Sequence, residues 1–374
     1  MVKLLLIPGP VEVPFSVSNA GSFVSNHRSS EFKNIVKENE ALLNKFSGAY
    51  KTVMVTGSGT LAVETMVFSL INDNDRVLSI SYGNFGERLI DSIDKKTGNT
   101  QFIKYDKLDM GALLNEIRSR EYDKLFLVHN ETSNGTALRD MSEIKKIVRD
   151  KGAKLLVDDV SGFGGYNMDM QGIYAMVTSS QKNLAAIPGI GIIFLSEQAY
   201  NDINSSPPVN VPFYLDLKTS LKFLEKGETA YTPSTGSFMS LNLALKILDK
   251  EGFDNRVKRI AASADFIRNT LMSNGVKIFG DDNIYSNTVI CFYSNDSDII
   301  KKLETCGITI SKGMGKIADT TLRIGTMGMI NNHYIGKFLN TYLSLAGKNV
   351  IIREDDIPVT TQLPDFLIDD VNLV

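Results

Sequence analysis

One lysine of this sequence, Lys182, has surroundings that suit covalent chemistry. It follows an apolar strand-like run and lies among small polar residues, in the segment Thr-Ser-Ser-Gln-Lys-Asn-Leu at 178–184. A lysine amine in such a place can act as a Schiff-base nucleophile. Asp158 ends a second apolar run, residues 154–157, and serves either as a local cap or as an anchor for a ligand. Taken singly, the pattern favours a solvated lysine and a capping aspartate.

A glycine cluster, Gly57-Ser58-Gly59-Thr60, follows another apolar strand and opens a helical pattern. Backbone N–H groups at such a turn bind anions, most often phosphate. Gly57, Gly59 and Ala62 also fit a dinucleotide-binding fingerprint, so an NAD-dependent dehydrogenase is an alternative. Against it, the cluster does not lie in the first unit of the chain, and Asp75 is weakly placed as a ribose ligand. A purely structural turn is the third interpretation.

Together these residues indicate a binding site for pyridoxal 5′-phosphate. That cofactor needs a lysine for covalent attachment, an acid that keeps its pyridine nitrogen protonated, and an anchor for its phosphate. Lys182, Asp158 and the glycine cluster supply the three, and Phe85 offers an aromatic face for the ring.

Short apolar runs alternate with amphipathic stretches over the first two thirds of the chain. This alternation predicts an α/β fold whose mostly parallel, seven-stranded sheet is flanked by helices. In such sheets ligands bind beyond the carboxyl ends of the strands, where the candidate residues fall. The helix preceding the sheet is expected from residue 32 to 46, with Ser29 or Ser30 as its N-cap and Gly48 just past its end. Strands are expected at residues 52–56, 76–80, 100–105, 124–129, 154–158, 174–178 and 191–195.

The last third reads as a smaller α+β unit, with strands expected at 276–279, 287–292, 308–311 and 321–324. We therefore predict a large domain over residues 15–260 and a small domain over 261–346 that also takes in residues 1–14. The acidic tail at 347–374 is expected to be a flexible end rather than a strap on a partner subunit.

Composition excludes several classes of protein. The 374 residues carry 40 basic and 43 acidic side chains, which shows no bias toward nucleic acid. No apolar run approaches the roughly 18 residues of a membrane helix, and the proline-rich start does not resemble a signal peptide. Cys291 and Cys306 lack the spacing of a disulfide framework or a metal site. We expect a cytoplasmic protein with no metal, membrane or nucleic-acid partner.

Ordered motifs give the chain a resemblance to the class V aminotransferases of fold type I, in particular the alanine–glyoxylate and serine–pyruvate aminotransferases. The resemblance covers roughly residues 5–346. The motifs that carry it are Pro8-Gly9-Pro10, Asn26-His27-Arg28-Ser29-Ser30-Glu31-Phe32, Gly57-Ser58-Gly59-Thr60, Tyr82-Gly83-Asn84-Phe85-Gly86-Glu87-Arg88, Glu131-Thr132-Ser133-Asn134-Gly135, Val157-Asp158-Asp159-Val160, Ser180-Gln181-Lys182 and Leu322-Arg323-Ile324-Gly325.

The resemblance implies a role for each matching position. Lys182 would carry the cofactor and move the proton, and Asp158 would pair with the pyridine nitrogen. Arg323 would hold the substrate carboxylate, Gly9 would line the substrate pocket, and Thr232 would reach the phosphate of a partner subunit in a homodimer. The remaining cofactor contacts would come from Gly59, Thr60, Phe85, Thr132, Val160 and Gln181.

The reaction so implied moves an amino group from alanine or serine to glyoxylate or pyruvate through a Schiff base at Lys182. Two alternatives stay open. One is an aspartate donor. The other is a phosphoserine or phosphonate substrate, which would need further cations such as His27 and Arg28. A cysteine desulfurase is disfavoured, because Phe85 stands where those enzymes stack a histidine. A dehydrogenase would leave Lys182 and Arg323 without roles, and their presence also argues against a non-catalytic protein.

Overall fold

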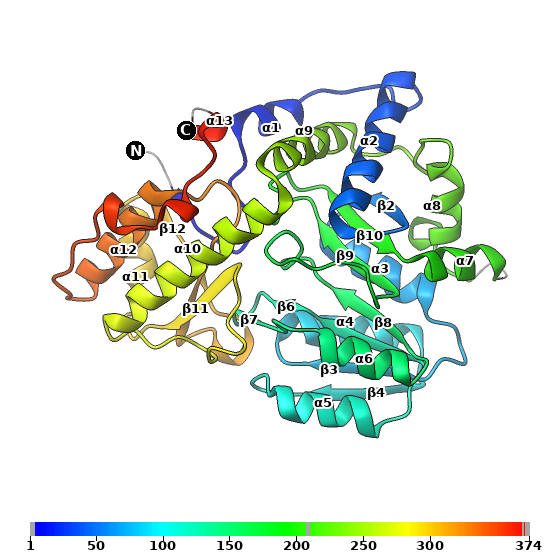
Figure 1. Ribbon diagram of the computed structural model, residues 1–374, viewed down its shortest axis with the longest axis horizontal. Coiled ribbons are helices and arrows are strands. Elements are labelled where there is room, and N and C mark those ends of the chain that lie inside the picture. The colour runs from blue at the N-terminus through cyan, green and yellow to red at the C-terminus, as the bar shows by residue number, and fades with distance from the viewer. Residues whose placement is uncertain (1–3, 207–209, 369, 371–374) are drawn as a thin grey trace.

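The computed structural model describes residues 4–206, 210–368 and 370 and consists of a larger α/β part and a smaller α+β part (Figure 1). The larger part is built on a seven-stranded sheet in the order β2-β10-β9-β8-β5-β3-β4. Only β10 runs antiparallel to its neighbours, so the predicted mostly parallel α/β fold is confirmed. The strands are β2 (Lys51–Thr56), β3 (Val77–Ser81), β4 (Thr100–Lys104), β5 (Lys124–Val128), β8 (Lys154–Asp158), β9 (Ala175–Ser179) and β10 (Ile190–Leu195).

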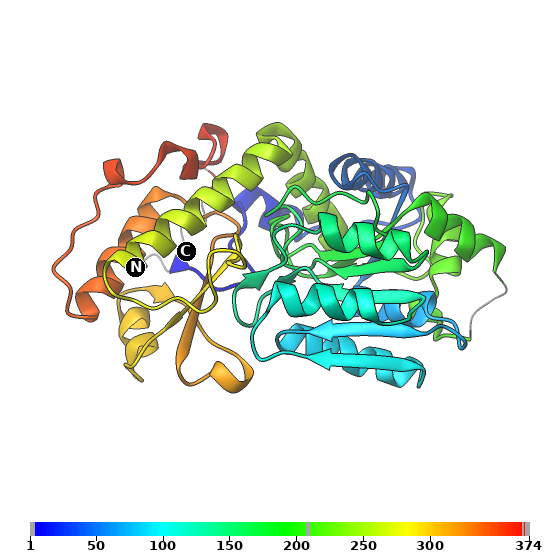
Figure 2. The same cartoon turned by 60° about the horizontal axis from the view of Figure 1, so that its bottom comes forward.

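Helices cover both faces of this sheet, which is why its central strands are mostly apolar and buried along their whole length. The pair α3 (Gly59–Leu70) and α4 (Asn84–Lys96) packs on one face, and the pair α5 (Met110–Ser119) and α6 (Ser142–Asp150) packs on the other (Figures 1 and 2). Each of these helices joins two parallel strands, so the residues that follow a strand all emerge at one edge of the sheet.

The remaining helices of the larger part lie around the edge formed by β2. Helix α2 (Ser30–Ser47) begins two residues before the expected range, and its N-cap is Ser29, one of the two predicted candidates: Ser29 Oγ accepts the N–H of Phe32 at 3.2 Å. It ends at Gly48, whose φ of 69° is left-handed. The others are α1 (Phe15–Ala20), α7 (Glu197–Ser205), α8 (Leu217–Leu224) and α9 (Thr235–Glu251).

The smaller part has its own apolar core, which includes Leu4, Phe292 and Phe338. Its three-stranded sheet has the order β11-β14-β13, and a short strand β1 pairs with β12. The elements are β1 (Leu4–Leu5), α10 (Phe253–Ser273), β11 (Val289–Tyr293), α11 (Ile299–Thr305), β12 (Ile308–Thr309), β13 (Ser311–Lys312), β14 (Thr321–Gly325) and α12 (Asn332–Leu345). The domain boundary at 260/261 stays a prediction, since α10 runs through it as one continuous helix (Figure 1).

Two strand predictions for this part need correction. Residues 276–279 form no strand; only Ile278 bridges to Phe292, because left-handed glycines at 275 and 280 confine the extended run. The strand expected at 308–311 is two short strands, β12 and β13, which belong to different sheets.

The acidic tail is not a free end over its described residues. Ile357, Leu363 and Leu367 are buried, and Thr361 contacts the side chain of Asn332. Near the end of the chain, Asp370 accepts hydrogen bonds from the N–H and the hydroxyl of Ser16 at 2.9 and 2.5 Å. The tail packs against its own chain, because residues 354–356 contact α12 and residues 359–361 contact α10.

No helix among the described residues combines the length and apolarity required to cross a bilayer.

Candidate active site

The carboxyl edge of the large sheet collects the residues that the sequence singled out. Asp158 ends β8, Lys182 lies three residues beyond β9, and Gly59 opens the helix after β2. Arg323 comes from β14 of the smaller part, and Gly9 comes from the segment that follows β1. The geometry thus brings residues from both parts of the molecule to one edge.

Lys182 is held against the N-terminal segment, where its Nζ donates to the carbonyl oxygen of Pro8. A Cβ on Gly9 would lie 2.5 Å from this Nζ, so no larger residue fits beside the amine. Burial lowers the pKa of Lys182 to about 8, with a further lowering from the charge of Arg323 and an opposing effect from Asp158. A lowered pKa gives the amine a larger unprotonated, nucleophilic fraction near neutral pH.

Asp158 is buried, and few contacts offset the cost of burying its negative charge. Its Oδ1 accepts the N–H of Val160 at 3.0 Å. Burial raises its pKa to about 7 despite that bond, and the charges of Glu131 and Asp159 raise it further. A cation placed beside Asp158 would relieve this cost.

The start of α3 offers an anion site. Its N-cap, Ser58, makes no capping bond with its side chain, and no backbone partner is found for the N–H groups of Gly59 and Thr60 within the described ranges. A Cβ at position 59 would lie 2.7 Å from Cγ2 of Val160, which explains why glycine occupies this place. Arg88 Nη1 donates to the hydroxyl of Thr60 at 3.2 Å.

Two further predicted residues border these groups. The hydroxyl of the buried Thr132 donates to Ser161 Oγ at 2.6 Å. Gln181 precedes the lysine, and its backbone carbonyl accepts the N–H of Val11, which ties the N-terminal segment to the lysine loop.

The ring of Phe85 is positioned by a residue whose role the sequence did not reveal. The buried Glu131 accepts the N–H groups of Phe85 and Gly86 at 3.2 and 3.0 Å, and it also accepts the N–H and the hydroxyl of Ser133. The carboxylate therefore fastens the start of α4 to the loop after β5. Glu131 belongs to a recognised motif, but its contact with a loop 45 residues away is a tertiary feature.

Arg323 is buried on β14 and is held at two of its nitrogens. Nε donates to the carbonyl of Lys312 and Nη1 to the carbonyl of Thr132, both at 2.8 Å. Burial lowers its pKa. Nη2 has no hydrogen-bond partner in the part of the chain that is described, which leaves donor capacity for a carboxylate.

Thr232 is not brought into this cluster by a direct bond. It is exposed in the loop between α8 and α9, next to Ser234, whose N–H bonds Thr56 Oγ1 at the end of β2. Arg28 is engaged elsewhere, in an ion pair with Glu228.

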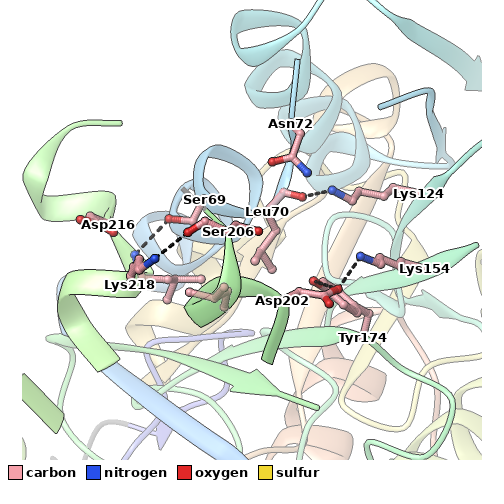
Figure 3. Close-up of a pocket in the computed structure, with 12 residues that line it drawn as sticks. Ser69, Leu70, Asn72, Lys124, Lys154, Tyr174, Asp202, Ser206, Asp216 and Lys218 are labelled. Atoms are coloured by element: carbon pink, nitrogen blue, oxygen red, sulfur yellow. Dashed lines mark hydrogen bonds and ion pairs between the residues drawn. The ribbon is translucent and has the colours of Figure 1, made fainter. Parts of the chain in front are cut away.

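A cavity of about 180 Å³ lies at the opposite, amino edge of the sheet (Figure 3). Lys124 and Lys154 are the first residues of β5 and β8, and each is paired with an aspartate: Lys124 with Asp75, and Lys154 with Asp202 at 2.6 Å. Asp75 thus lies at the edge away from the glycine cluster and is bound to a buried lysine. This removes the ribose ligand that the dehydrogenase alternative required.

A model of the family "Aminotransferase class-V" matches residues 15–329. The chain belongs to the class V aminotransferases. It is 36% identical to an uncharacterized aminotransferase of Methanocaldococcus jannaschii over 87% of this chain and 88% of the relative. It is 30% identical to the mouse alanine–glyoxylate aminotransferase over 87% and 83% of the two chains. The crystal structure of an alanine–glyoxylate aminotransferase from Nostoc sp. shares the fold, with a TM-score of 0.85, 23% identity and coverage of 92% and 96%.

The predicted family, fold type I and pyridoxal 5′-phosphate as cofactor are thereby confirmed. The edge described above suits that group in this class V aminotransferase. Asp158 is a carboxyl group whose pKa is raised by burial, the first N–H groups of α3 have no backbone partner within the described residues, and Lys182 has a lowered pKa. The cofactor supplies an electron-accepting ring, and the chain has to bind it, orient it and handle the protons.

Proposed function

We propose that this aminotransferase moves the amino group of a small L-amino acid, alanine or serine, to a small 2-oxo acid, glyoxylate or pyruvate. The observation that carries the proposal is the convergence of three residues at a single edge, where the charges of Arg323 and Asp158 both act on the buried amine of Lys182. One buried guanidinium with a free nitrogen suits a substrate with one carboxylate. The relatives that share the family include enzymes named for alanine, serine and glyoxylate, which supports the same substrate class.

The roles we assign follow from the environments of the residues. Lys182 attaches the cofactor and, when released, its amine takes and returns the proton at the substrate Cα. Asp158 keeps the pyridine nitrogen protonated, and Arg323 orients the substrate carboxylate. The free N–H groups of Gly59 and Thr60 bind the phosphate, with the amide of Gln181 beside them.

The ring of the cofactor would be enclosed by three further side chains. Phe85, fastened by Glu131, covers one face, and Val160 covers the other. Thr132 supplies a hydroxyl for the ring oxygen. Gly9 lines the substrate pocket beside Lys182, where a Cβ would lie 2.5 Å from the Nζ of the lysine.

We also propose a homodimer in which Thr232 completes the phosphate site of the partner. Thr232 is exposed, and the stacked rings of Tyr214 and Tyr231 lie beside it, with centroids 3.8 Å apart. Phe213, 59% exposed, extends this aromatic surface. Sedimentation velocity of the holoenzyme should show a dimer. Thr232→Ala should weaken binding of the cofactor phosphate, and the variant should remain a dimer. A monomer with full activity would contradict the proposal.

The substrate assignment is tested by mixing holoenzyme with single amino donors and then with single 2-oxo acids. Alanine, serine, aspartate, phosphoserine and 2-aminoethylphosphonate are compared as donors, and the amino acids formed from glyoxylate and pyruvate are separated and measured. We expect alanine and serine to have the highest kcat/KM. A clear preference for aspartate would support that alternative donor. A preference for phosphoserine or 2-aminoethylphosphonate would show that the site binds a second anionic group of the substrate. Either result would overturn the proposed substrate class.

A further inference from the structure

We propose that Arg88 is an additional ligand of the cofactor phosphate and that it supplies the positive charge which the other phosphate ligands lack. The inference rests on the site roles proposed above for Thr60 and Phe85. Arg88 belongs to the Tyr82–Arg88 motif, in which only Phe85 has been given a role.

The position of Arg88 follows from the geometry of α4. Phe85 and Arg88 are three residues apart in the first turns of this helix and therefore share a face. The guanidinium carbon lies 4.8 Å from the centroid of the Phe85 ring, and Nη1 donates to Thr60 Oγ1 at 3.2 Å. One side chain thus touches both the proposed ring-stacking residue and a proposed phosphate ligand.

A second observation places Arg88 close to the cofactor site. Its charge acts on the buried Asp158, where it is one of the influences that lower the pKa of that carboxyl. Asp158 ends β8, whereas Thr60 lies on α3, so the guanidinium is near residues from two separate elements at this edge.

The charge balance at the start of α3 explains what this guanidinium contributes. The N–H groups of Gly59 and Thr60 and the amide of Gln181 are neutral, whereas a phosphate monoester carries nearly two negative charges at neutral pH. Lys182 is assigned to the covalent link and Arg323 to the substrate carboxylate. Arg88 forms no ion pair with a carboxylate in residues 4–206, 210–368 and 370. Its bond to Thr60 uses one of the five donors of a guanidinium, which leaves the rest for a phosphate.

The anchoring of α4 keeps this arrangement in place. Glu131 holds the N–H groups of Phe85 and Gly86, so the first turn cannot shift relative to the sheet. The direction of Arg88 is therefore set by the same carboxylate that positions the ring of Phe85.

The experiment compares pyridoxal 5′-phosphate with pyridoxal, which differs from it only in lacking the phosphate. Dissociation constants of both are measured on the cofactor-free wild type, Arg88→Gln and Arg88→Lys by quenching of tyrosine fluorescence. Arg118→Gln is the matched control, because Arg118 is also an exposed helical arginine but pairs with Glu143. Far-ultraviolet circular dichroism verifies that each variant is folded.

Arg88→Gln should weaken pyridoxal 5′-phosphate by about tenfold or more and change pyridoxal by less than about twofold. Arg88→Lys should retain part of the phosphate affinity, and Arg118→Gln should match the wild type. An equal loss for both compounds would show that Arg88 only supports Phe85 and would overturn the phosphate role, as would no loss. Failure of the wild type to bind pyridoxal 5′-phosphate would instead refute the site assignment on which this inference rests.

Discussion

Replacing Asp158 by asparagine should stabilise the cofactor-free protein above neutral pH while it removes catalytic activity. Asp158 is 6% exposed, and burial raises its pKa from an ordinary 3.8 to about 7. Asparagine retains an oxygen that can accept the N–H of Val160, the bond that Asp158 makes at 3.0 Å. It has no proton to lose, so the cost of a buried negative charge disappears.

The sign of the effect follows from the direction of the shift. Because the pKa is higher in the folded than in the unfolded state, folding favours the protonated form. The stability contributed by that proton is complete below about pH 4 and is lost as the pH rises to about 7. Each pH unit well inside this window is equivalent to about 1.4 kcal/mol and the slope falls near pH 7, so the wild type should lose about 2 kcal/mol relative to Asp158→Asn between pH 5 and pH 7.

Urea unfolding of the two cofactor-free proteins at several pH values from 5 to 8 measures this difference. Asp123→Asn is the control, because Asp123 is bonded to Arg76, which lowers its pKa to about 2, and should show no change over this range. The holoenzyme should reverse the order, since the protonated pyridine nitrogen gives the wild-type carboxylate a cation. A free-energy difference between Asp158→Asn and wild type that stays constant from pH 5 to pH 8 would refute the reasoning.

Substitutions at three further positions test the remaining groups. Lys182→Ala should lower kcat by on the order of 10²–10⁴-fold, and borohydride reduction followed by mass spectrometry should find no cofactor attached to the chain, whereas persistent attachment would exclude Lys182 as its site. Arg323→Ala should cost roughly 2–5 kcal/mol in kcat/KM for alanine, and Arg323→Lys should recover little of it; near-normal kinetics in either variant would remove Arg323 from the substrate site. Gly9→Ala should lower the melting temperature, because the φ of 119° at this position strains any residue with a Cβ. It should also attach little cofactor, because its Cβ would lie 2.5 Å from Lys182 Nζ; normal attachment measured by the same mass spectrometry would contradict this.

The sequence alone was sufficient for the local features of the fold and for the kind of site. Alternating apolar strands and amphipathic helices predicted the parallel sheet, because strands buried on both faces are mostly apolar. Ser29 and Gly48 marked the ends of α2, because the hydrogen bonds that cap a helix lie within one turn of its end. Lysine, aspartate and a glycine turn at the ends of such strands were enough to indicate the cofactor, since the topology brings those ends to one edge.

The tertiary structure decided what depends on burial and on contacts between distant segments. Residues 276–279 have strand-like composition, yet flanking left-handed glycines leave them a single bridge. The acidic tail was expected to be free, but Ile357 and Leu363 have apolar surfaces to cover only once α10 and α12 are folded. The pKa values of Asp158 and Lys182 arise from desolvation, which no local pattern reveals.

The same limit applies to the fine structure of the site. Arg323 donates to the carbonyl of Thr132, a residue 191 positions away, and Glu131 holds the start of α4 from the loop after β5. Arg88 reaches Thr60 from a different helix. A sequence pattern records spacing along one segment, whereas these bonds depend on the packing of strands and helices in three dimensions. For that reason residue types could suggest the chemistry, and only the folded chain could show which side chains support it.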